Sequence, residues 1–557
     1  MQIGAMVFIE TIKPVHFPQN RCWRYTRGMS RLIPRFAPPL VAKVTAPERS
    51  STMQYDDSQK AVIACNDKLV VAEAFAGAGK TTTAVGFTDA RPKTSALYVC
   101  FNRANAMEAR QRFGDHVECK STHAIAWAAV GRRYSDQLVK GSWKARQLQE
   151  ELGLHDIRVA AMAQGVLNSF FASPDATLSE QHLEDARLQY GANDVEMGSA
   201  MDAARLSWRR MQSPGEAISV PHDAYLKLWA LSSPRLPFDQ IILDEAQDTN
   251  PVVVDVIRKQ RHAKMLLIGD RHQAIYGFRK AHNAMELFSA MGATVLKMPK
   301  TWRFGPDIAN VANALLRHFK GETTSIVGAG PAKAPRRDSP KAVLSRTNAG
   351  LFREAAEVDG RGIHWVGGIE GYRVDALMDA WHLKRGQRAS IMSPVLRQYT
   401  SWRQFEDEAQ ATQDPESRLL CSFITQYNAQ TPDLVRAFKA KALPSEQGAK
   451  LVLATAHKSK GLDFDHVCIG EDFECINKAH QAMLDSSGDL PENFRQEINL
   501  LYVAATRARH RLSLNTETRL FMEKLAHYQT LLHQALQSKQ DEQEQDQVHP
   551  SITPSTR

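Results

Sequence analysis

Apolar and polar residues alternate along the chain in blocks that predict short strands separated by helices. Apolar runs typical of buried strands occupy residues 69–72, 96–101, 117–120, 239–243, 265–268, 341–345 and 451–455. A helix is predicted at residues 104–113, and residues 124–231 are predicted to form a long helical insertion. Strands that alternate with helices favour an α/β fold with parallel sheets.

The two ends of the chain do not show this pattern. Residues 1–52 have no sustained period and contain six prolines, and the residues after about 537 are polar. We expect residues 538–557 to be disordered. The basic leader is open to three interpretations: a flexible nucleic-acid arm, a targeting segment, or an artefact of start-site choice, because Met53 precedes the first motif. We favour disorder or start-site choice over targeting.

A glycine-containing loop separates the first predicted strand from a helix. Residues 74–81, AFAGAGKT, match the phosphate-loop pattern G-x-x-x-x-G-K-[ST] except for Ala74, where the pattern has a glycine. In such a loop the backbone N–H groups face the phosphates. Lys80 reaches the β- and γ-phosphates, and the Thr81 hydroxyl holds Mg²⁺. A chance glycine turn before a helix is the alternative. The predicted nucleotide contacts are Ala74, Phe75, Ala76, Gly77, Ala78, Gly79, Lys80, Thr81 and Thr82.

Two acidic residues at the end of a later strand fit the same nucleotide. Asp244 and Glu245 directly follow the apolar run at residues 239–243. Asp244 can hold Mg²⁺ together with Thr81, and Glu245 can polarise the attacking water. Adjacent acids are common on protein surfaces. An apolar strand that runs straight into them, downstream of a phosphate loop, favours the catalytic interpretation.

Two glutamines are further candidates for the nucleotide site. Gln273 follows the strand predicted at residues 265–268 and is placed to sense the γ-phosphate. A polar turn is the alternative for this residue. Gln59 lies upstream of the phosphate loop, and its amide can read adenine because it both donates and accepts hydrogen bonds.

Aromatic and polar residues near strand ends are candidates for nucleic-acid contacts, because parallel sheets bind ligands at the carboxyl ends of their strands. Tyr276 and Phe278 offer stacking surfaces, although two core aromatics are the alternative. Phe101 and His123 are balanced between a structural and a DNA-facing role. Basic residues interleaved with tryptophans in residues 124–231 suit a nucleic-acid face. Solvated helices with buried tryptophans are the slightly preferred interpretation.

Composition sets limits on the site and the compartment. The 557 residues carry a net charge of +9, but residues 1–52 hold eight basic and two acidic side chains and account for six of these charges. A DNA path elsewhere must therefore come from local placement of side chains. The seven cysteines form no C-x-x-C pair or zinc spacing. We therefore expect no metal cluster and a cytoplasmic compartment, or a nuclear one in a eukaryote. No apolar run is long enough to span a bilayer.

Taken together, the motifs resemble the UvrD/Rep/PcrA class of superfamily 1 DNA helicases. Residues 75–81, 244–248 and 269–279 carry this resemblance. The segments LYVCFNR, TWRF and LSRTN, at residues 97–103, 301–304 and 344–348, are most similar to the F-box DNA helicase branch. The similarity concerns the motor part, and no F-box is evident. The ordered motifs run from Tyr55 to Arg509, which is most of the chain.

The resemblance implies an α/β fold with two RecA-like P-loop NTPase cores, each with a mainly helical insertion, and the nucleotide between them. The first core would comprise residues 53–300, with its insertion at about 124–231. The second core would comprise residues 301–350 and 449–537, with an insertion at 351–448. A helix would begin at Thr301, and Leu500, Leu501, Val503 and Ala504 would give the helix of the last motif its packing face.

The resemblance also assigns roles to individual residues. Trp302 would stack on adenine, Arg303 would approach the γ-phosphate, and Arg507 would act as an arginine finger. Asp463, where the family usually has Glu, would reach the ribose hydroxyl with a shorter side chain. Arg279 would join the nucleotide contacts. The residues expected to contact DNA are Phe101, Asn102, Thr122, His123, Tyr276, Phe278, Thr455 and His457.

The resulting hypothesis is an ATP- and Mg²⁺-dependent helicase that moves 3′ to 5′ on single-stranded DNA and acts at single-strand/duplex junctions in repair or recombination. One alternative is a translocase that strips proteins, such as recombinase filaments, from single strands, because the insertion at residues 351–448 is small. Another is a nucleotide-gated DNA-binding module without turnover. We expect no membrane partner, and the sequence indicates no protein partner. A fused nuclease is not expected, because little chain follows the last motif.

Overall fold

The computed structural model describes residues 54–100, 102–141, 143–190, 194–277, 284–331, 339–358, 362–527 and 530, without the side chains of residues 185, 188, 189 and 415. All of these except Gln54 belong to one compact unit, Tyr55–Arg557. The predicted leader and tail lie outside the described residues, as do three predicted site residues, Phe101, Phe278 and Arg279.

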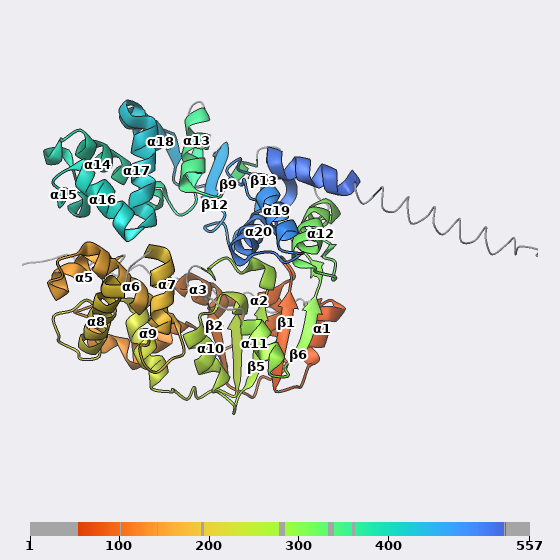
Figure 1. The fold of residues 1–557 in the computed structure, drawn as a ribbon. Helices are drawn as coiled ribbons and strands as arrows, with labels where there is room; N and C mark the ends of the chain where they lie inside the picture. The colour runs from red at the N-terminus through yellow and green to blue at the C-terminus, as the bar shows by residue number, and fades with distance from the viewer. Residues whose placement is uncertain are drawn as a thin grey trace, which may run out of the picture. The chain divides into compact units, whose positions relative to one another are not determined.

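The first half of the unit is built on a parallel sheet of six strands (Figure 1). Its order is β3-β2-β4-β5-β1-β6, with β1 Leu69–Ala74, β2 Ala96–Cys100, β3 Val117–Ser121, β4 Gln240–Asp244, β5 Lys264–Gly269 and β6 Thr294–Met298. The central strands are almost entirely buried, which is why they are continuous apolar runs in the sequence.

Successive residues of β1 point to opposite faces of this sheet and are covered by different helices. Val70 packs in the cluster that includes α1 (Asp57–Ala64), α2 (Lys80–Asp89) and α3 (Arg103–Arg112). Val71 packs in the cluster on the other face, which includes α10 (Pro251–Arg258) and α11 (Ala284–Ala290). The sheet is therefore the middle layer of three.

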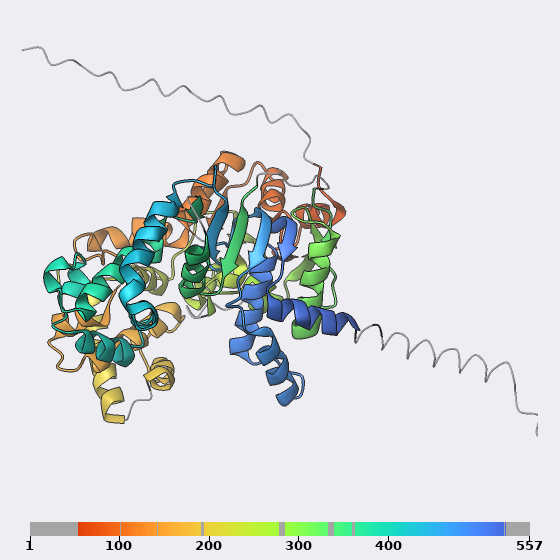
Figure 2. The ribbon, with the colours of Figure 1, turned by 90° about the horizontal axis from the view of Figure 1, so that it is seen from above.

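The second half has the same plan. Its parallel sheet has the order β11-β10-β12-β9-β13-β14, with β9 Lys341–Ser345, β10 Ile363–Trp365, β11 Ala442–Leu443, β12 Leu451–Thr455, β13 Phe464–Ile469 and β14 Ala508–Ser513. One face packs on α12 (Pro306–Lys320), α19 (Ile476–Asp485) and α20 (Glu492–Ala505), and the other packs on α13 (Asn348–Glu357). Figure 2 shows helices on both sides of these strands.

The predicted α/β fold class with two RecA-like sheets is thus confirmed. The packing face of the last motif is also as predicted, since Leu500, Leu501, Val503 and Ala504 are all buried. The prediction that a helix begins at Thr301 is wrong. Thr301 ends a short strand, β7 (Lys300–Thr301), which pairs with β8 (Val327–Gly328). The helix begins at Pro306, because a proline fits the first helical turn, where its missing N–H is not needed.

Both insertions are mainly helical. The first contains α4 (Thr122–Ala129), α5 (Ala145–Leu152), α6 (Ile157–Ala172), α7 (Gln181–Tyr190), α8 (Asp194–Met211) and α9 (His222–Leu231). The second contains α14 (Val374–Lys384), α15 (Pro394–Arg397), α16 (Trp402–Thr412), α17 (Pro415–Tyr427) and α18 (Thr431–Lys441). The domain boundaries given by the sequence remain predictions.

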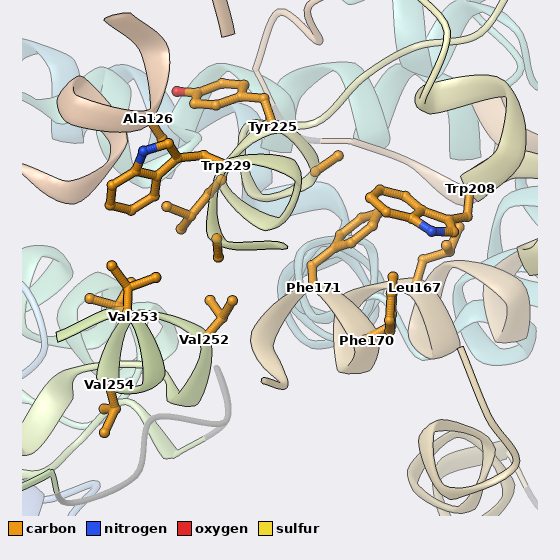
Figure 3. Packing of buried hydrophobic residues seen from close by; sticks show 14 of the residues in the cluster. Ala126, Leu167, Phe170, Phe171, Trp208, Tyr225, Trp229, Val252, Val253 and Val254 are labelled. Atoms are coloured by element: carbon orange, nitrogen blue, oxygen red, sulfur yellow. The ribbon is translucent and has the colours of Figure 1, made fainter. Parts of the chain in front are cut away.

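An aromatic cluster holds the first insertion together (Figure 3). Phe170 and Phe171 of α6 meet Trp208 of α8 with ring centroids 5.2 and 5.7 Å apart. The cluster continues to Val252 and Val253 of α10, so the insertion shares its core with the sheet layer below. For Trp208 the structural interpretation of a buried tryptophan is correct.

Among the described residues, no helix combines the length and the apolar character needed to cross a bilayer.

Replacing Phe170 with alanine should destabilise the insertion. The side chain is fully buried between Trp208 and the Lys227 ammonium, and removing a buried phenyl group costs about 3–5 kcal/mol. We expect a clear fall in the melting temperature measured by circular dichroism. Val195→Ala is the control, because Val195 is 80% exposed on α8 and should change stability by less than about 0.5 kcal/mol. Equal melting temperatures for the two variants would contradict the proposed core.

Candidate nucleotide and DNA site

The phosphate loop is shaped by two glycines in the left-handed region. Gly77 has φ +77° and Gly79 has φ +79°, which other residues adopt only with strain. A Cβ on Gly77 would also lie 2.4 Å from the Thr301 Oγ1. The Trp302 N–H donates to the Gly77 carbonyl at 2.9 Å. The loop is therefore held against the segment that follows β7.

The loop leads into α2, whose first residue is Lys80. Gly79 occupies the N-cap and offers no side chain to the first N–H groups of the helix. Unpaired N–H groups at a helix start are a favourable site for phosphate. The Lys80 Nζ lies 2.7 Å from the Glu245 Oε1, at the end of β4. The predicted partners from two distant segments are thus brought together.

Asp244 has the surroundings of a magnesium ligand. The Tyr98 hydroxyl donates to its Oδ2 at 2.5 Å and also interacts with the Thr81 side chain. Its Oδ1 is buried and has no hydrogen-bond partner among the described residues. Burial and the neighbouring Glu245 charge raise the pKa of Asp244 to about 6. A buried oxygen with an open position beside a threonine hydroxyl suits Mg²⁺, which prefers oxygen ligands, so these residues fit the ion.

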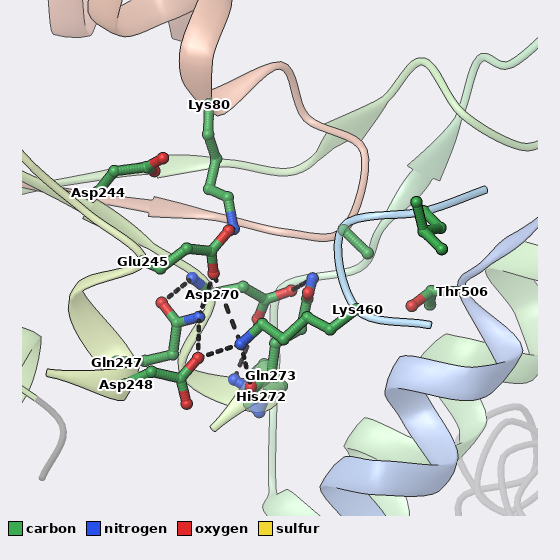
Figure 4. A network of polar contacts seen from close by, with 12 residues as sticks. Lys80, Asp244, Glu245, Gln247, Asp248, Asp270, His272, Gln273, Lys460 and Thr506 are labelled. Atoms are coloured by element: carbon green, nitrogen blue, oxygen red, sulfur yellow. Dashed lines mark hydrogen bonds and ion pairs between the residues drawn. The ribbon is translucent and has the colours of Figure 1, made fainter. Parts of the chain in front are cut away.

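Glu245 stands at a strained position between two cations (Figure 4). Its φ of +50° is rare for a residue with a side chain, and such strain is concentrated at functional sites. The Lys460 Nζ lies 3.6 Å from its second oxygen, opposite Lys80. Although burial opposes ionisation, Lys80 and Lys460 hold the pKa of Glu245 well below its usual range. The carboxylate is therefore kept charged.

Lys460 also joins the two cores through Asp248 and the β5 loop. It forms an ion pair with the buried Asp248 carboxylate and donates to the Gln273 carbonyl at 2.9 Å. Gln247 donates to both Glu245 and Asp248, at 2.5 and 3.2 Å. Lys460 comes from the segment after β12, so one side chain of the second core meets three residues of the first.

A second bridge between the cores runs through Asp270. Its carboxylate accepts from the Gln273 amide at 2.7 Å and from the Tyr502 hydroxyl of α20 at 3.0 Å. The same hydroxyl accepts the Ala76 N–H of the phosphate loop at 3.3 Å. A change in the phosphate loop can therefore reach Gln273 through three hydrogen bonds.

The two arginines predicted to approach the γ-phosphate, Arg303 and Arg507, lie beside the residues described above. The Arg507 Nη2 lies 3.4 Å from the Gln273 Oε1, and its guanidinium is buried. Burial and the nearby Arg303 charge lower the pKa of Arg507 to about 9. Arg303 pairs with Asp463 at 2.9 Å and donates to the Thr506 carbonyl.

The residues predicted to contact adenine and ribose, and Thr82 of the phosphate loop, have different neighbours in the structure. Gln59 is buried and donates to the Ala78 carbonyl of the loop at 3.2 Å. Trp302 is partly exposed, with the Lys300 ammonium 4.2 Å from its ring centroid. Asp463 pairs with Arg303 and, at 3.0 Å, with Arg509. The Thr82 hydroxyl accepts from Arg112 at 2.9 Å.

Four of the predicted DNA contacts line one cavity of about 750 Å³. They are Asn102, Thr122, His123 and Tyr276. Asp244 and Glu245 line the same cavity, so it borders the predicted hydrolytic site.

Thr455 and His457 do not line this cavity. The His457 ring lies 6.2 Å from that of Tyr276, and the buried Thr455 hydroxyl accepts the Lys458 N–H at 3.4 Å.

Sequence reasoning missed several residues that complete the site. They are Tyr98, Gln247, Asp248, Asp270, Lys460 and Tyr502. Most lie inside or beside motifs that were recognised. The usable signal was a further acidic residue after β4, Asp248, and an acidic residue directly after β5, Asp270, because polar residues at the ends of neighbouring strands converge.

Two protein families match this chain. The UvrD/REP helicase N-terminal domain matches residues 164–290, and the UvrD-like helicase C-terminal domain matches residues 392–519. The chain thus carries the N- and C-terminal domains of a UvrD-like helicase. The predicted family resemblance is thereby confirmed.

Similar proteins point to the same branch as the sequence motifs. F-box DNA helicase 1 of Gallus gallus is 30% identical over 79% of this chain and 47% of its own length. F-box DNA helicase protein 1 of Schizosaccharomyces pombe is 30% identical over 86% of this chain and 60% of its own length. The chain thus spans about half to three fifths of the length of these two F-box helicases. DNA helicase II of Escherichia coli is 31% identical over 19% of this chain and 16% of its own length.

Replacing Lys460 with methionine should destabilise this UvrD-like protein. The change leaves Asp248 buried without its cation, and breaking a buried ion pair in this way costs about 3–5 kcal/mol. We expect a lower melting temperature than for Lys478→Met, since Lys478 is exposed on α19. A melting temperature equal to that of the control would mean that Lys460 does not hold the cores together.

Proposed function

We propose that the chain is an ATP-dependent DNA helicase that moves 3′ to 5′ along single strands and unwinds duplex DNA from single-strand/duplex junctions, in repair or recombination. The observation that carries this proposal is the position of Glu245. It pairs with Lys80 of the phosphate loop and lines the same cavity as His123 and Tyr276. The group proposed to activate water thus borders the proposed path of the strand. A cytoplasmic or nuclear compartment belongs to the same hypothesis.

The proposed catalytic roles follow from charge and position. ATP is the substrate, with Lys80 and the start of α2 holding its phosphates. Thr81 and Asp244 would hold Mg²⁺, which neutralises phosphate charge when bound. Glu245, kept ionised by its two lysines, orients and polarises the attacking water. Arg303 and Arg507 supply positive charge from the second core.

Movement would come from the contacts that join the cores. Lys460, Tyr502 and Arg507 each meet the first core at a residue close to the phosphate site. Such polar contacts have alternative partners, so nucleotide turnover can favour one arrangement of the cores over another. The aromatic ring of Tyr276 lies beneath Lys460, 5.4 Å from its Nζ. A shift of Lys460 would therefore change the surroundings of Tyr276, a residue proposed to contact DNA.

A translocase that clears proteins from single strands is the second candidate. The second insertion uses acidic residues to contact the first: Asp414 and Glu416 pair with Lys144, and Glu408 pairs with Arg146. Acidic side chains on this surface do not favour binding of duplex phosphates. A gated binding module without turnover is a further possibility, which the ATPase measurement below addresses directly.

Unwinding of tailed duplexes tests the proposal. With ATP and Mg²⁺, a 3′-tailed duplex should be unwound, whereas 5′-tailed and blunt duplexes should not, because a protein that moves 3′ to 5′ along a single strand reaches the junction only from a 3′ tail. ATP hydrolysis stimulated by single strands without unwinding would favour the clearing translocase. Strand separation of the 5′-tailed duplex alone would overturn the assigned direction.

Replacing Glu245 with glutamine should separate binding from hydrolysis. The phosphate loop and Lys80 stay intact, so ATP binding should persist, while loss of the general base should lower turnover by about 10²–10⁴-fold. Turnover is followed as phosphate release with single-stranded DNA, and binding with a fluorescent ATP analogue. Glu118→Gln is the matched control, because Glu118 lies on β3 beside Lys120, outside the site. Near-normal turnover of the Glu245 variant would remove the catalytic assignment.

A further inference from the structure

A cluster of charged side chains beside the phosphate loop has no role assigned by the motifs. At its centre is Glu322, which follows α12 and whose side chain is only 3% exposed. Its carboxylate pairs with Arg271 at 2.9 Å and with Lys297 at 3.2 Å, and it accepts the Thr324 N–H at 2.9 Å. A fourth partner is His272, whose Nε2 lies 3.1 Å from the Glu322 Oε2. A buried carboxylate with four partners is held in one orientation.

The cluster also reaches the strand that leads into the phosphate loop. Arg271 and Lys297 approach the Glu73 carboxylate at 3.5 and 3.9 Å, and Glu73 is the residue before the last of β1. The hydrogen bond from His272 and the two cations hold the pKa of Glu322 well below its usual range, although burial opposes ionisation. Two cations thus face two carboxylates, and the cluster is balanced without a charge on His272.

His272 connects this cluster to the phosphate loop through its ring. The ring is stacked on that of Phe75, with centroids 5.8 Å apart and an angle of 17° between the planes. The Tyr502 ring meets it edge-on at 6.1 Å, and all three side chains are buried. Phe75 belongs to the loop, and the Tyr502 hydroxyl accepts the Ala76 N–H. The imidazole, next to Gln273 in Figure 4, therefore packs both on the loop and on the side chain that binds it.

The helix α12 connects Glu322 to another part of the nucleotide site. It begins at Pro306, three residues after Arg303, and ends at Lys320, two residues before Glu322. Arg303 is proposed to approach the γ-phosphate. One helix thus carries a proposed phosphate contact ahead of its start and the partner of His272 after its end. The contact between Glu322 and His272 therefore ties this helix to the phosphate loop.

We propose that His272 and Glu322 are positioning residues for ATP binding: Glu322 fixes the His272 ring, and this ring supports Phe75 so that the N–H groups of the loop face the phosphates. The inference rests on the proposed function, because ATP is the ligand of the loop. The pair acts through Phe75 and does not touch the nucleotide. A purely structural pair would affect only stability, whereas a positioning pair sets the affinity for ATP.

The variant His272→Gln tests the role of the ring. The glutamine amide can still donate to Glu322, so the charges of the cluster stay paired while the flat surface against Phe75 is lost. We expect the KM for ATP to rise about 10- to 100-fold, as for other residues that orient a binding group from behind, with kcat changed by less than about twofold. The measurement is phosphate release over a range of ATP concentrations with saturating single-stranded DNA. A wild-type KM would overturn the proposal.

The variant Glu322→Ala tests whether the carboxylate acts through the ring. It should also raise the KM for ATP, and the double variant should be no worse than the more affected single variant, because both changes remove the same support. Effects that multiply in the double variant would overturn the link between the two residues. His272→Gln keeps the proposal testable if Glu322→Ala does not fold.

Asp379→Ala is the matched control. Asp379 is also a buried carboxylate, and it accepts the N–H groups of Met392 and Ser393 in the second insertion. Its loss should lower the melting temperature and leave the KM for ATP unchanged. A rise in KM equal to that of Glu322→Ala would show a general effect of lost stability and would contradict the positioning role.

The result can be separated from the proposed function. ATP hydrolysis with an unchanged KM in both the His272 and the Glu322 variants would overturn the positioning role and leave the motor intact. Absence of ATP hydrolysis by the wild-type protein would instead overturn the proposed function itself.

Discussion

The rest of the structure depends on one shared carboxylate, that of Glu245. It lies at the end of β4 with Lys80 of its own core on one side and Lys460 of the second core on the other. Buried charges are stable only when they are paired, so Asp248 of the first core and Lys460 of the second depend on each other. Gln247 belongs to the same network, because it donates a hydrogen bond to the Asp248 carboxylate that pairs with Lys460. The cores are thus held together by a set of charges that a nucleotide phosphate would alter directly.

This arrangement explains why the fold is stable yet able to change. The apolar clusters on the faces of the two sheets hold most of each core together, although one of them also includes Phe75 and Ile275 of the first core beside the second sheet. Their burial is insensitive to a bound anion. Many contacts between the cores that surround the phosphate loop are instead polar, such as those of Lys460, Tyr502 and Arg507. A phosphate group in the loop would compete for Lys80 and so change the balance of charge around Glu245. The contacts whose strength a bound nucleotide would change are therefore concentrated where ATP would bind.

The sequence predicted those features that have local signals. The phosphate loop, Asp244 and Glu245 follow continuous apolar strands and could be located from those strands alone. The strands β10 and β11 were missed because three and two residues are too few for a pattern, and β14 was missed because its sequence, ARHRLS, is largely polar. The partners of the site could not be foreseen. Tyr502 meets Ala76 across 426 residues, and Lys460 meets Asp248 across 212, and nothing in the local sequence specifies either contact.

The division of charge within the molecule also bears on how it would hold DNA. Beyond the basic leader the chain is nearly neutral, and Lys80, Arg303 and Lys460 of the site pair with carboxylates and do not line the cavity. A strand held mainly through its phosphates would resist each forward step, because every charge pair must break before the next can form. Neutral contacts to bases, such as the one proposed for Tyr276, would be weaker individually and could be renewed at every nucleotide. The low charge of the cavity is thus what a protein that must release the strand repeatedly requires.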